Sequence, residues 1–577
     1  MTAGPVPVAK GRLFGGETVI VATIALYIGI LGLWPLARLF VEALSAGPNG
    51  ELLGLLRAQW ASAAALRALF NTVEASLLAT LVAVVIGSAV ALVLALTDLR
   101  GKAALTFLAL LPLLVPSQVA ALAWIELTSP SSPVLVAMLA PFGLAPEPGA
   151  TNFLYSKWGI VLVLGVEQST LVFLAVRAGL RNLPRDLVEA ARLGGAHPLR
   201  VTRSVILPLA LPAILAGAAL AFVSSIGNFA IPAMLGIPGR YTMLTTLIYQ
   251  RLQGFGPRVL GEVAALALML AALAVVGLIA RALITRRSQF VTEGATGPIE
   301  PFRLGGWHLV VAGPLWLVLV AIAVLPLLAL IAASLAPALG VPLRLDTATW
   351  ENYRFALIEQ DATLRAFRNS FLLAFVTAGL SAAIAVPLAY LVALRRQRLA
   401  RVLDVVADAP YAVPGTVLAI AIILVFLPPL PLLDVSLYGT LGIILVAYLA
   451  RFLALALRPT MAGMERVNRN LDEAAQVAGA GVLRRLAAVI LPVVAPSAAA
   501  GALLIFMTTF NELTVSALLW SSGRETVGVV VFFLQYEGNS PAAAAVGTIS
   551  VAVTLALAGL AGRLGRNLPD GVVPWRA

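Results

Sequence analysis

The sequence predicts an all-α polytopic membrane protein with about twelve transmembrane helices, arranged as two parallel six-helix repeats. Sixty per cent of the 577 residues are hydrophobic and 11% are charged, whereas soluble domains carry about 25% charged residues. Twelve apolar runs are each close to the roughly 20 residues that a membrane-spanning helix needs. Finally, blocks of sequence in the first half of the chain recur in the second half at a constant offset.

The predicted spans fall evenly into the two halves. The first six cover residues 18–40, 74–97, 104–127, 158–180, 206–235 and 262–284. The second six cover residues 308–335, 370–394, 402–427, 438–457, 490–520 and 542–562. Two spans contain proline pairs that predict kinks, at Pro112 and Pro116 and at Pro410 and Pro414. We therefore expect a first half at 1–290, a cytoplasmic linker at 291–307 and a second half at 308–577.

The distribution of basic residues indicates the orientation. Lys and Arg gather in alternate loops, which all lie on one side of the membrane if there are twelve spans. The opposite loops are poorer in Lys and Arg, apart from the longer loop before the eighth span, which contains Arg344, Arg354, Arg365 and Arg368. Because Lys and Arg favour cytoplasmic loops, we expect both termini in the cytoplasm and the protein in the inner (plasma) membrane of a bacterium. The net charge of +12 then reflects topology, and no nucleic-acid partner is expected.

Residue types that support common chemistries are scarce. The chain has no cysteine and only two histidines, which excludes disulfides, thiolate nucleophiles and Cys- or His-rich metal sites. No clustered set of catalytic residues is visible either. We therefore predict no catalytic residue, no metal site and no cofactor in this chain.

The repeat is clearest around one block. Glu-Ala-Ala-Arg-Leu-Gly-Gly begins at Glu189 and runs on to Ile-Leu-Pro at Pro208, while Glu-Ala-Ala-Gln-Val-Ala-Gly begins at Glu473 and runs on to Ile-Leu-Pro at Pro492. The offset is 284 at both ends (473 − 189 and 492 − 208). Earlier in the chain the offset is 298, relating Asn71 to Asn369 and Pro116 to Pro414. Six spans separate the copies, so the repeats are parallel, and such repeats point to a transport pathway at their interface.

Each block lies in a loop between the fourth and fifth spans of its half, at residues 186–208 and 470–492. It predicts a short amphipathic helix that ends at glycine. Small alanine side chains on such a helix permit close approach of a partner. The predicted contact residues are Glu189, Ala190, Ala191 and Gly195 in the first copy, and Glu473, Ala474, Ala475 and Gly479 in the second.

The full pattern, Glu-Ala-Ala-x3-Gly-x9-Val-x-Leu-Pro, resembles the EAA loop of binding-protein-dependent ABC importer permeases. Val205 and Val489 stand where the family usually has Ile. The resemblance implies the type I ABC importer permease fold, with each loop forming a coupling helix that docks into an ATPase subunit. It also implies two copies of a cytoplasmic ABC ATPase and a periplasmic or tethered solute-binding protein as partners.

The ATPase is expected in a separate chain, together with its ATP and Mg. A phosphate-binding P-loop requires the pattern G-x4-G-K-[ST]. The Gly101-Lys102 pair is followed by Ala103, and Leu96 occupies the place of the first glycine. The chain is therefore predicted to be a transporter subunit and not an enzyme.

Charged and amide side chains within the spans are candidates for the translocation path or gate, because they are costly in a membrane. Glu167 and Arg451 are related by the offset of 284, and we expect them to approach the common axis and form an ion pair; separate polar contacts are the alternative. Asn228, Asn511 and Glu512 lie in otherwise apolar segments, where they predict an irregular backbone lining a cavity or hydrogen bonds between helices.

The solute is predicted less directly. Fused permeases of this length resemble ferric-iron importers, and Asn-Glu-Leu-Thr-Val-Ser at 511–516 is most similar to that branch. Thiamine, polyamine and aminophosphonate importers share much of the pattern and stay as alternatives. A secondary transporter driven by an ion gradient is the competing class; several carboxylates near the midplane would mark it, but Glu167 and Glu512 are the main ones present.

Overall fold

The computed structural model describes residues 16–564 apart from 46–49, 145–146, 148–149, 255, 257, 288–299, 339–340, 342, 345 and 431–433. These residues form helices and connecting segments, with one isolated β-bridge between Thr97 and Phe302. The predicted location of the termini concerns residues outside this description, as does most of the predicted linker.

Ten helices or helix runs in the described residues are long and apolar enough to span a membrane, and two bent helix pairs raise the number to twelve. In the first half the long helices are α1 (Gly16–Tyr27) with α2 (Trp34–Ala43), α4 (Ala63–Leu96), α8 (Lys157–Arg181), α10 (Pro198–Val201) with α11 (Leu207–Gly227), and α13 (Val259–Arg287). In the second half they are α14 (His308–Leu319) with α15 (Leu325–Ser334), α17 (Asp361–Ala389), α21 (Leu441–Met464), α23 (Val482–Arg485) with α24 (Leu491–Phe510), and α27 (Ser540–Leu564).

The third and ninth predicted spans are sharply bent. The chain bends by 107° between helices α5 (Lys102–Leu114) and α6 (Ser117–Thr128). It bends by 105° between the segment that contains α18 (Arg398–Ala407) and α19 (Ala409–Ala412) and the following helix α20 (Gly415–Phe426). Pro116 and Pro414 lie at the two bends. A residue before proline avoids the helical conformation, and both Val115 and Val413 are extended.

The fifth and eleventh predicted spans, at 206–235 and 490–520, end earlier than expected. Helix α11 ends at Gly227 and α24 at Phe510. In each half the polar residue after the break caps the turn that follows: Asn228 Oδ1 accepts from the amide of Ile231 at 3.1 Å, and Glu512 Oε1 accepts from the amide of Val515 at 2.8 Å. The predicted irregular backbone is confirmed, and the repeat reproduces its cap because such side chains satisfy amides that a new turn leaves open.

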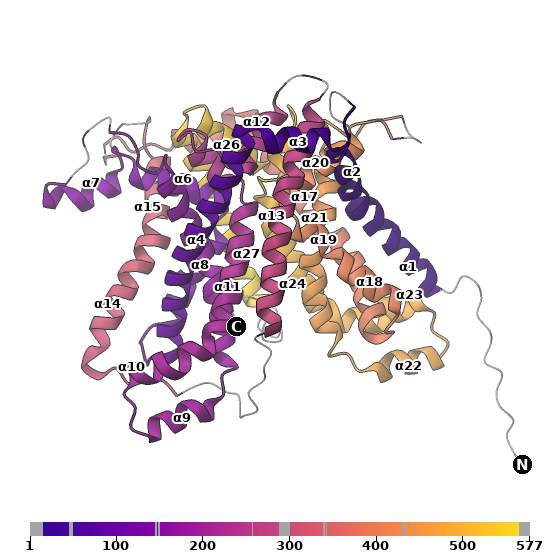
Figure 1. Ribbon diagram of the computed structural model, residues 1–577, viewed down its shortest axis with the longest axis horizontal. Coiled ribbons are helices and arrows are strands. Elements are labelled where there is room, and N and C mark those ends of the chain that lie inside the picture. Colours follow the sequence, from indigo (N-terminus) through magenta and orange to yellow (C-terminus); the bar gives the residue numbers. More distant parts are fainter. Residues whose placement is uncertain are drawn as a thin grey trace, which may run out of the picture.

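Equivalent asparagines fasten the ends of the two halves that lie opposite the repeated loops (Figure 1). Asn71 Nδ2 donates to the carbonyl of Thr242, and Asn369 Nδ2 donates to the carbonyl of Glu525, both at 2.9 Å. The same side-chain type thus ties the start of a long helix to a distant loop in each half, which explains why an amide recurs there.

The two halves exchange their first helices. Helix α1 contacts α17, α18 and α23 of the second half, and α2 packs against α20. In return, α14 contacts α5, and α15 packs against α6 of the first half. Figure 1 shows the indigo α1 beside the orange helices and the pink α14 beside the purple ones. The halves are contiguous in sequence but interleaved in space.

Candidate functional site: the coupling loops and the central breaks

The two repeated loops fold as matched short helices. Helices α9 (Arg185–Leu193) and α22 (Arg469–Val477) each contain nine residues and lie at the same end of the molecule (Figure 1). Gly195 and Gly479 follow with φ of +74° and +79°. This left-handed conformation suits glycine at a helix C-terminus, so the glycine of the motif turns the chain towards the next membrane helix.

Large apolar side chains project from both loops. Leu193 is 90% exposed and Val477 is 91% exposed, and these two positions are related by the repeat offset. The same offset relates two further exposed pairs, Leu187 with Leu471 and Leu199 with Leu483. Exposed apolar clusters of this kind mark interaction surfaces. Glu189 forms an ion pair with Arg185 on the surface of α9.

The inner side of the first loop is apolar. Val188 and Val201 are buried in one hydrophobic cluster. At the end of α9, Arg192 Nη1 lies 3.8 Å from Glu300 Oε2, and the guanidinium lies 4.3 Å from the centre of the Phe302 ring. The backbone of Phe302 forms hydrogen bonds with the backbone of Leu96 and Asp98 at the end of α4. The segment that leads into α14 of the second half therefore holds the coupling loop of the first half.

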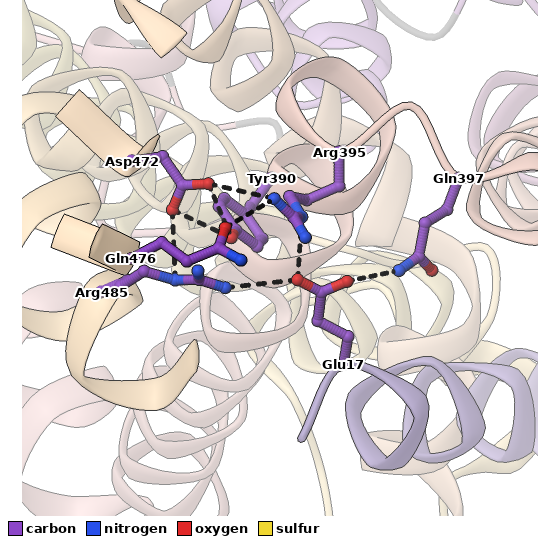
Figure 2. A network of polar contacts seen from close by, with 7 residues as sticks. All are labelled: Glu17, Tyr390, Arg395, Gln397, Asp472, Gln476 and Arg485. Atoms are coloured by element: carbon purple, nitrogen blue, oxygen red, sulfur yellow. Dashed lines mark hydrogen bonds and ion pairs between the residues drawn. The ribbon is translucent and has the colours of Figure 1, made fainter. Parts of the chain in front are cut away.

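The inner side of the second loop is ionic (Figure 2). At the positions of Val188 and Val201 stand Asp472 and Arg485, each 3% exposed, with Nε of Arg485 3.3 Å from Oδ1 of Asp472. Two residues that follow α17 contact this pair: the Tyr390 hydroxyl donates to Asp472 Oδ1 at 3.0 Å, and Arg395 Nη1 lies 3.6 Å from Asp472 Oδ2.

Glu17, in the first turn of α1, completes the network. Its Oε1 lies 2.8 Å from Arg395 Nε and 3.2 Å from Arg485 Nη2, and its Oε2 accepts from Gln397 at 2.8 Å. Gln476 on α22 also accepts from Arg395. The first loop is thus fastened by the segment that leads into α14, and the second loop by the first turn of α1, so each is held by the start of the opposite half.

A polar cluster lies at the central break of the first half. Ser117 donates to Glu167 Oε1 at 2.6 Å, and Asn228 Nδ2 lies 3.4 Å from Glu167 Oε2. These residues come from α6, α8 and the break after α11. They are held together although 50 or more residues separate them in sequence.

The equivalent positions in the second half are Gly415, Arg451 and Glu512. Arg451 occupies the space that a side chain at Gly415 would need, because a Cβ built there would lie 2.2 Å from Nη1. That nitrogen is buried and has no hydrogen-bond partner in the described part of the chain. Glu512 instead accepts from the backbone amides of Val515 and Ser516.

The expected ion pair between Glu167 and Arg451 is absent among the described residues. Glu167 accepts from Ser117 and Asn228, while the Arg451 guanidinium lies 5.7 Å from the centre of the Phe452 ring. The two side chains therefore make separate contacts, polar for Glu167 and with an aromatic ring for Arg451. The repeat places the two residues at equivalent sites, but each side chain turns towards the bend of its own half.

The two breaks nevertheless meet across the halves. Gln118 Nε2, just after the first bend, donates to the carbonyl of Asn511 at 2.8 Å. In the mirrored contact, Gly227 faces Pro414 at the second bend, with a constructed Cβ 3.6 Å from the Pro414 Cβ. The Asn511 side chain bonds Thr554 and Ser550 of α27. The predicted polar residues thus surround the central contact between the repeats.

Sequence reasoning missed several residues of these sites. Ser117 and Gly415 could have been found, because the offset of 298 relates them next to the matched prolines. Glu17, Asp472 and Arg485 carry no comparable signal, since Glu17 is distant in sequence and the other two replace valines of the first copy. No group of three or more His, Cys, Asp or Glu side chains suited to a metal ion occurs in the described residues.

Comparison with known proteins decides the family. Residues 83–289 and 385–568 each match the model of the binding-protein-dependent transport system inner membrane component. The two matches cover more than half of the chain. The chain belongs to this family. It is therefore a multi-pass membrane protein and a permease subunit of an ABC transporter, with the type I importer permease fold, and not an enzyme.

Individual relatives agree with this assignment. A probable ABC transporter permease of Sinorhizobium fredii is 28% identical over 80% of this chain and 81% of its own length. A Fe(3+)-transport system permease of Haemophilus influenzae is 24% identical over 80% of this chain and 83% of its own. A putative 2-aminoethylphosphonate transport system permease of Salmonella paratyphi A is 32% identical over 39% of this chain and 77% of its own. Family membership implies an ATPase and a solute-binding protein as partners.

Proposed function

We propose that this permease imports a solute delivered by a binding protein, using alternating access driven by two copies of a separate ABC ATPase that bind ATP and Mg. The ATPases would dock on α9 and α22, with Glu189, Ala190, Ala191 and Gly195 and the equivalent Glu473, Ala474, Ala475 and Gly479 in the contact. In this arrangement the coupling loops and both termini face the cytoplasm, as the positive-inside rule favours.

The observation that carries the proposal is the matched exposure on the two loops. Three apolar pairs, related by one offset of 284, are exposed at one end of the molecule. A surface that contacts only water gains nothing from two equivalent sets of large exposed apolar side chains. Two identical docking partners give a reason for both sets.

We propose a gating role for Glu167, Arg451, Asn228, Asn511 and Glu512. Support comes from the helix breaks that meet between the repeats, where parallel repeats place a transport path. Asn228, Asn511 and Glu512 follow two of these breaks, and Glu167 and Arg451 contact residues beside them. A buried guanidinium nitrogen of Arg451 that lacks a hydrogen-bond partner among the described residues is costly and is available for a new contact when the halves move.

We propose ferric iron as the solute. Support comes from the fused relatives, since the ferric permeases of Haemophilus influenzae and Actinobacillus pleuropneumoniae match 80% and 70% of this chain, whereas the aminoethylphosphonate permease matches 39%. Aminoethylphosphonate is the second candidate because its permease is more similar in sequence where it aligns, at 32% identity. Selectivity would then lie mainly in the binding protein.

Two experiments test these proposals separately. Purification of the permease with its ATPase under mild detergent tests docking: we expect a stable complex that the double substitution Leu193→Glu and Val477→Glu abolishes. A complex that survives this change would refute the docking surface. Uptake of radioactive ferric iron, 2-aminoethylphosphonate and thiamine by cells expressing the complete importer then tests the solute, and uptake of phosphonate without iron would refute the ferric assignment.

A further inference from the structure

A cavity of about 220 Å³ lies between α4, α5 and α8 at the end of the first half that carries the coupling loop. Three cationic side chains line it: Lys102, Arg177 and Arg181. Its remaining wall is largely apolar and includes Leu94, Phe173 and Leu180. The chain turns from this cavity directly into α9, since α8 ends at Arg181 and α9 begins at Arg185.

The three cations have no oppositely charged partner at ion-pair distance, within 4.0 Å, among the described residues. Arg177 Nη1 is buried without a hydrogen-bond partner, and its guanidinium lies 5.8 Å from the centre of the Phe173 ring. Asp98 attracts Lys102 electrostatically, but these two described side chains form no hydrogen bond or ion pair with each other. Oδ1 of Asp98 instead accepts a hydrogen bond from the amide of Leu304.

The dipole of α8 does not compensate the positive charge of all three side chains. The C-terminal carbonyls of α8 favour a cation in its last turn, at Arg181, but this effect falls off within one turn. Arg177 lies four residues earlier. Like charges at i and i+4 destabilise a helix, and a third cation, Lys102, faces them at the positive N-terminal end of α5.

The second half lacks this cationic cluster. At the positions of Lys102, Arg177 and Arg181 the repeat has Ala400, Met461 and Glu465. The nearby Arg458 is bound by two carboxylates, with Nη2 2.9 Å from Asp404 and 2.7 Å from Asp408. The cationic cluster is therefore specific to the first half and is not imposed by the fold.

We propose that this cavity binds a phosphate-type oxyanion, either the phosphate of an anionic phospholipid head group or a free phosphate-type anion. Arginine forks match phosphate oxygens with two parallel hydrogen bonds, and basic pockets between membrane helices bind anionic head groups. The apolar wall suits the first acyl carbons of a lipid. The proposal does not depend on the transported solute or on ATPase docking.

Native mass spectrometry of the full chain in detergent tests the site with phosphatidylglycerol, phosphatidylcholine and inorganic phosphate as probes. We expect at least tenfold preference for phosphatidylglycerol over phosphatidylcholine if the source is lipid, or retention of inorganic phosphate if the source is a free anion. The triple substitution Lys102→Gln, Arg177→Gln and Arg181→Gln should abolish either preference. The conservative substitution Arg177→Lys should keep part of the preference. This milder variant distinguishes loss of binding from misfolding of the triple variant.

The matched control removes three exposed arginines of the second half, by Arg396→Gln, Arg398→Gln and Arg401→Gln. This control loses the same charge but lies outside the cavity, so it should bind as the unaltered chain does. An equal loss in the control, no preference for either probe in the unaltered chain, or full binding by the cavity variant would each overturn the proposal.

Discussion

The buried pair Asp472–Arg485 allows a test in which the protein supplies its own reference. The first half has Val188 and Val201 at these positions, buried in an apolar cluster. Removing one partner of a buried ion pair costs about 3–5 kcal/mol, whereas replacing both with apolar residues is often neutral. The double substitution Asp472→Val and Arg485→Val copies the arrangement of the first half into the second.

The contacts that remain to the unchanged partner determine how much stability each single substitution costs. Asp472→Val leaves Arg485 with Glu17 at 3.2 Å, so we expect a loss of about 2–3 kcal/mol, below the range for an isolated charge. Arg485→Val leaves Asp472 with Tyr390 and Arg395 and should cost a similar amount. The double variant also loses the contacts of Asp472 with Arg395 and of Arg485 with Glu17, but Arg395 and Glu17 stay paired with each other at 2.8 Å. Its main loss is therefore the Tyr390 hydrogen bond, about 1 kcal/mol. The free energy of coupling between the two positions should therefore be at least about 2 kcal/mol.

The assay is unfolding of the detergent-solubilised permease, with the full double-mutant cycle measured under one condition. Each single variant should unfold more easily than the double variant. Single and double variants that lose stability additively would refute the reasoning, because the pair would then contribute no more than its separate side chains. Val188→Ala provides a control for packing loss alone, since it removes apolar volume from the equivalent site without leaving a charge.

Three further outcomes follow from the structure. Gly87→Val should destabilise the permease by at least about 1–3 kcal/mol in thermal unfolding, because a Cβ there would lie 2.4 Å from the α8 backbone; an unchanged melting temperature would contradict this packing. Gly415→Leu should displace the Arg451 guanidinium and change ATP-driven uptake, whereas uptake equal to that of the unaltered permease would show that this position of Arg451 is not needed. The double substitution Glu189→Lys and Glu473→Lys should lower ATPase affinity at least tenfold in a binding titration, and an affinity within twofold would argue against these residues as contacts.

The sequence could predict the membrane class, the number of spans and the short helices in the two repeated loops, because these depend on local properties. Apolar runs of membrane length identify helices without reference to their neighbours. The repeated motif is continuous in sequence, and its glycines mark the helix ends that Gly195 and Gly479 adopt. The prolines at the two bends were also visible, although the angle of the bends was not.

Tertiary structure alone decided how the halves combine. The exchange of first helices, the network from Glu17 to Asp472 and the separation of Glu167 from Arg451 all join residues far apart in the chain. A repeat offset relates equivalent positions, but it does not say which half a helix packs against or where a long side chain turns. Those outcomes depend on packing and on which buried charges find partners, and both are settled only when the whole chain has folded.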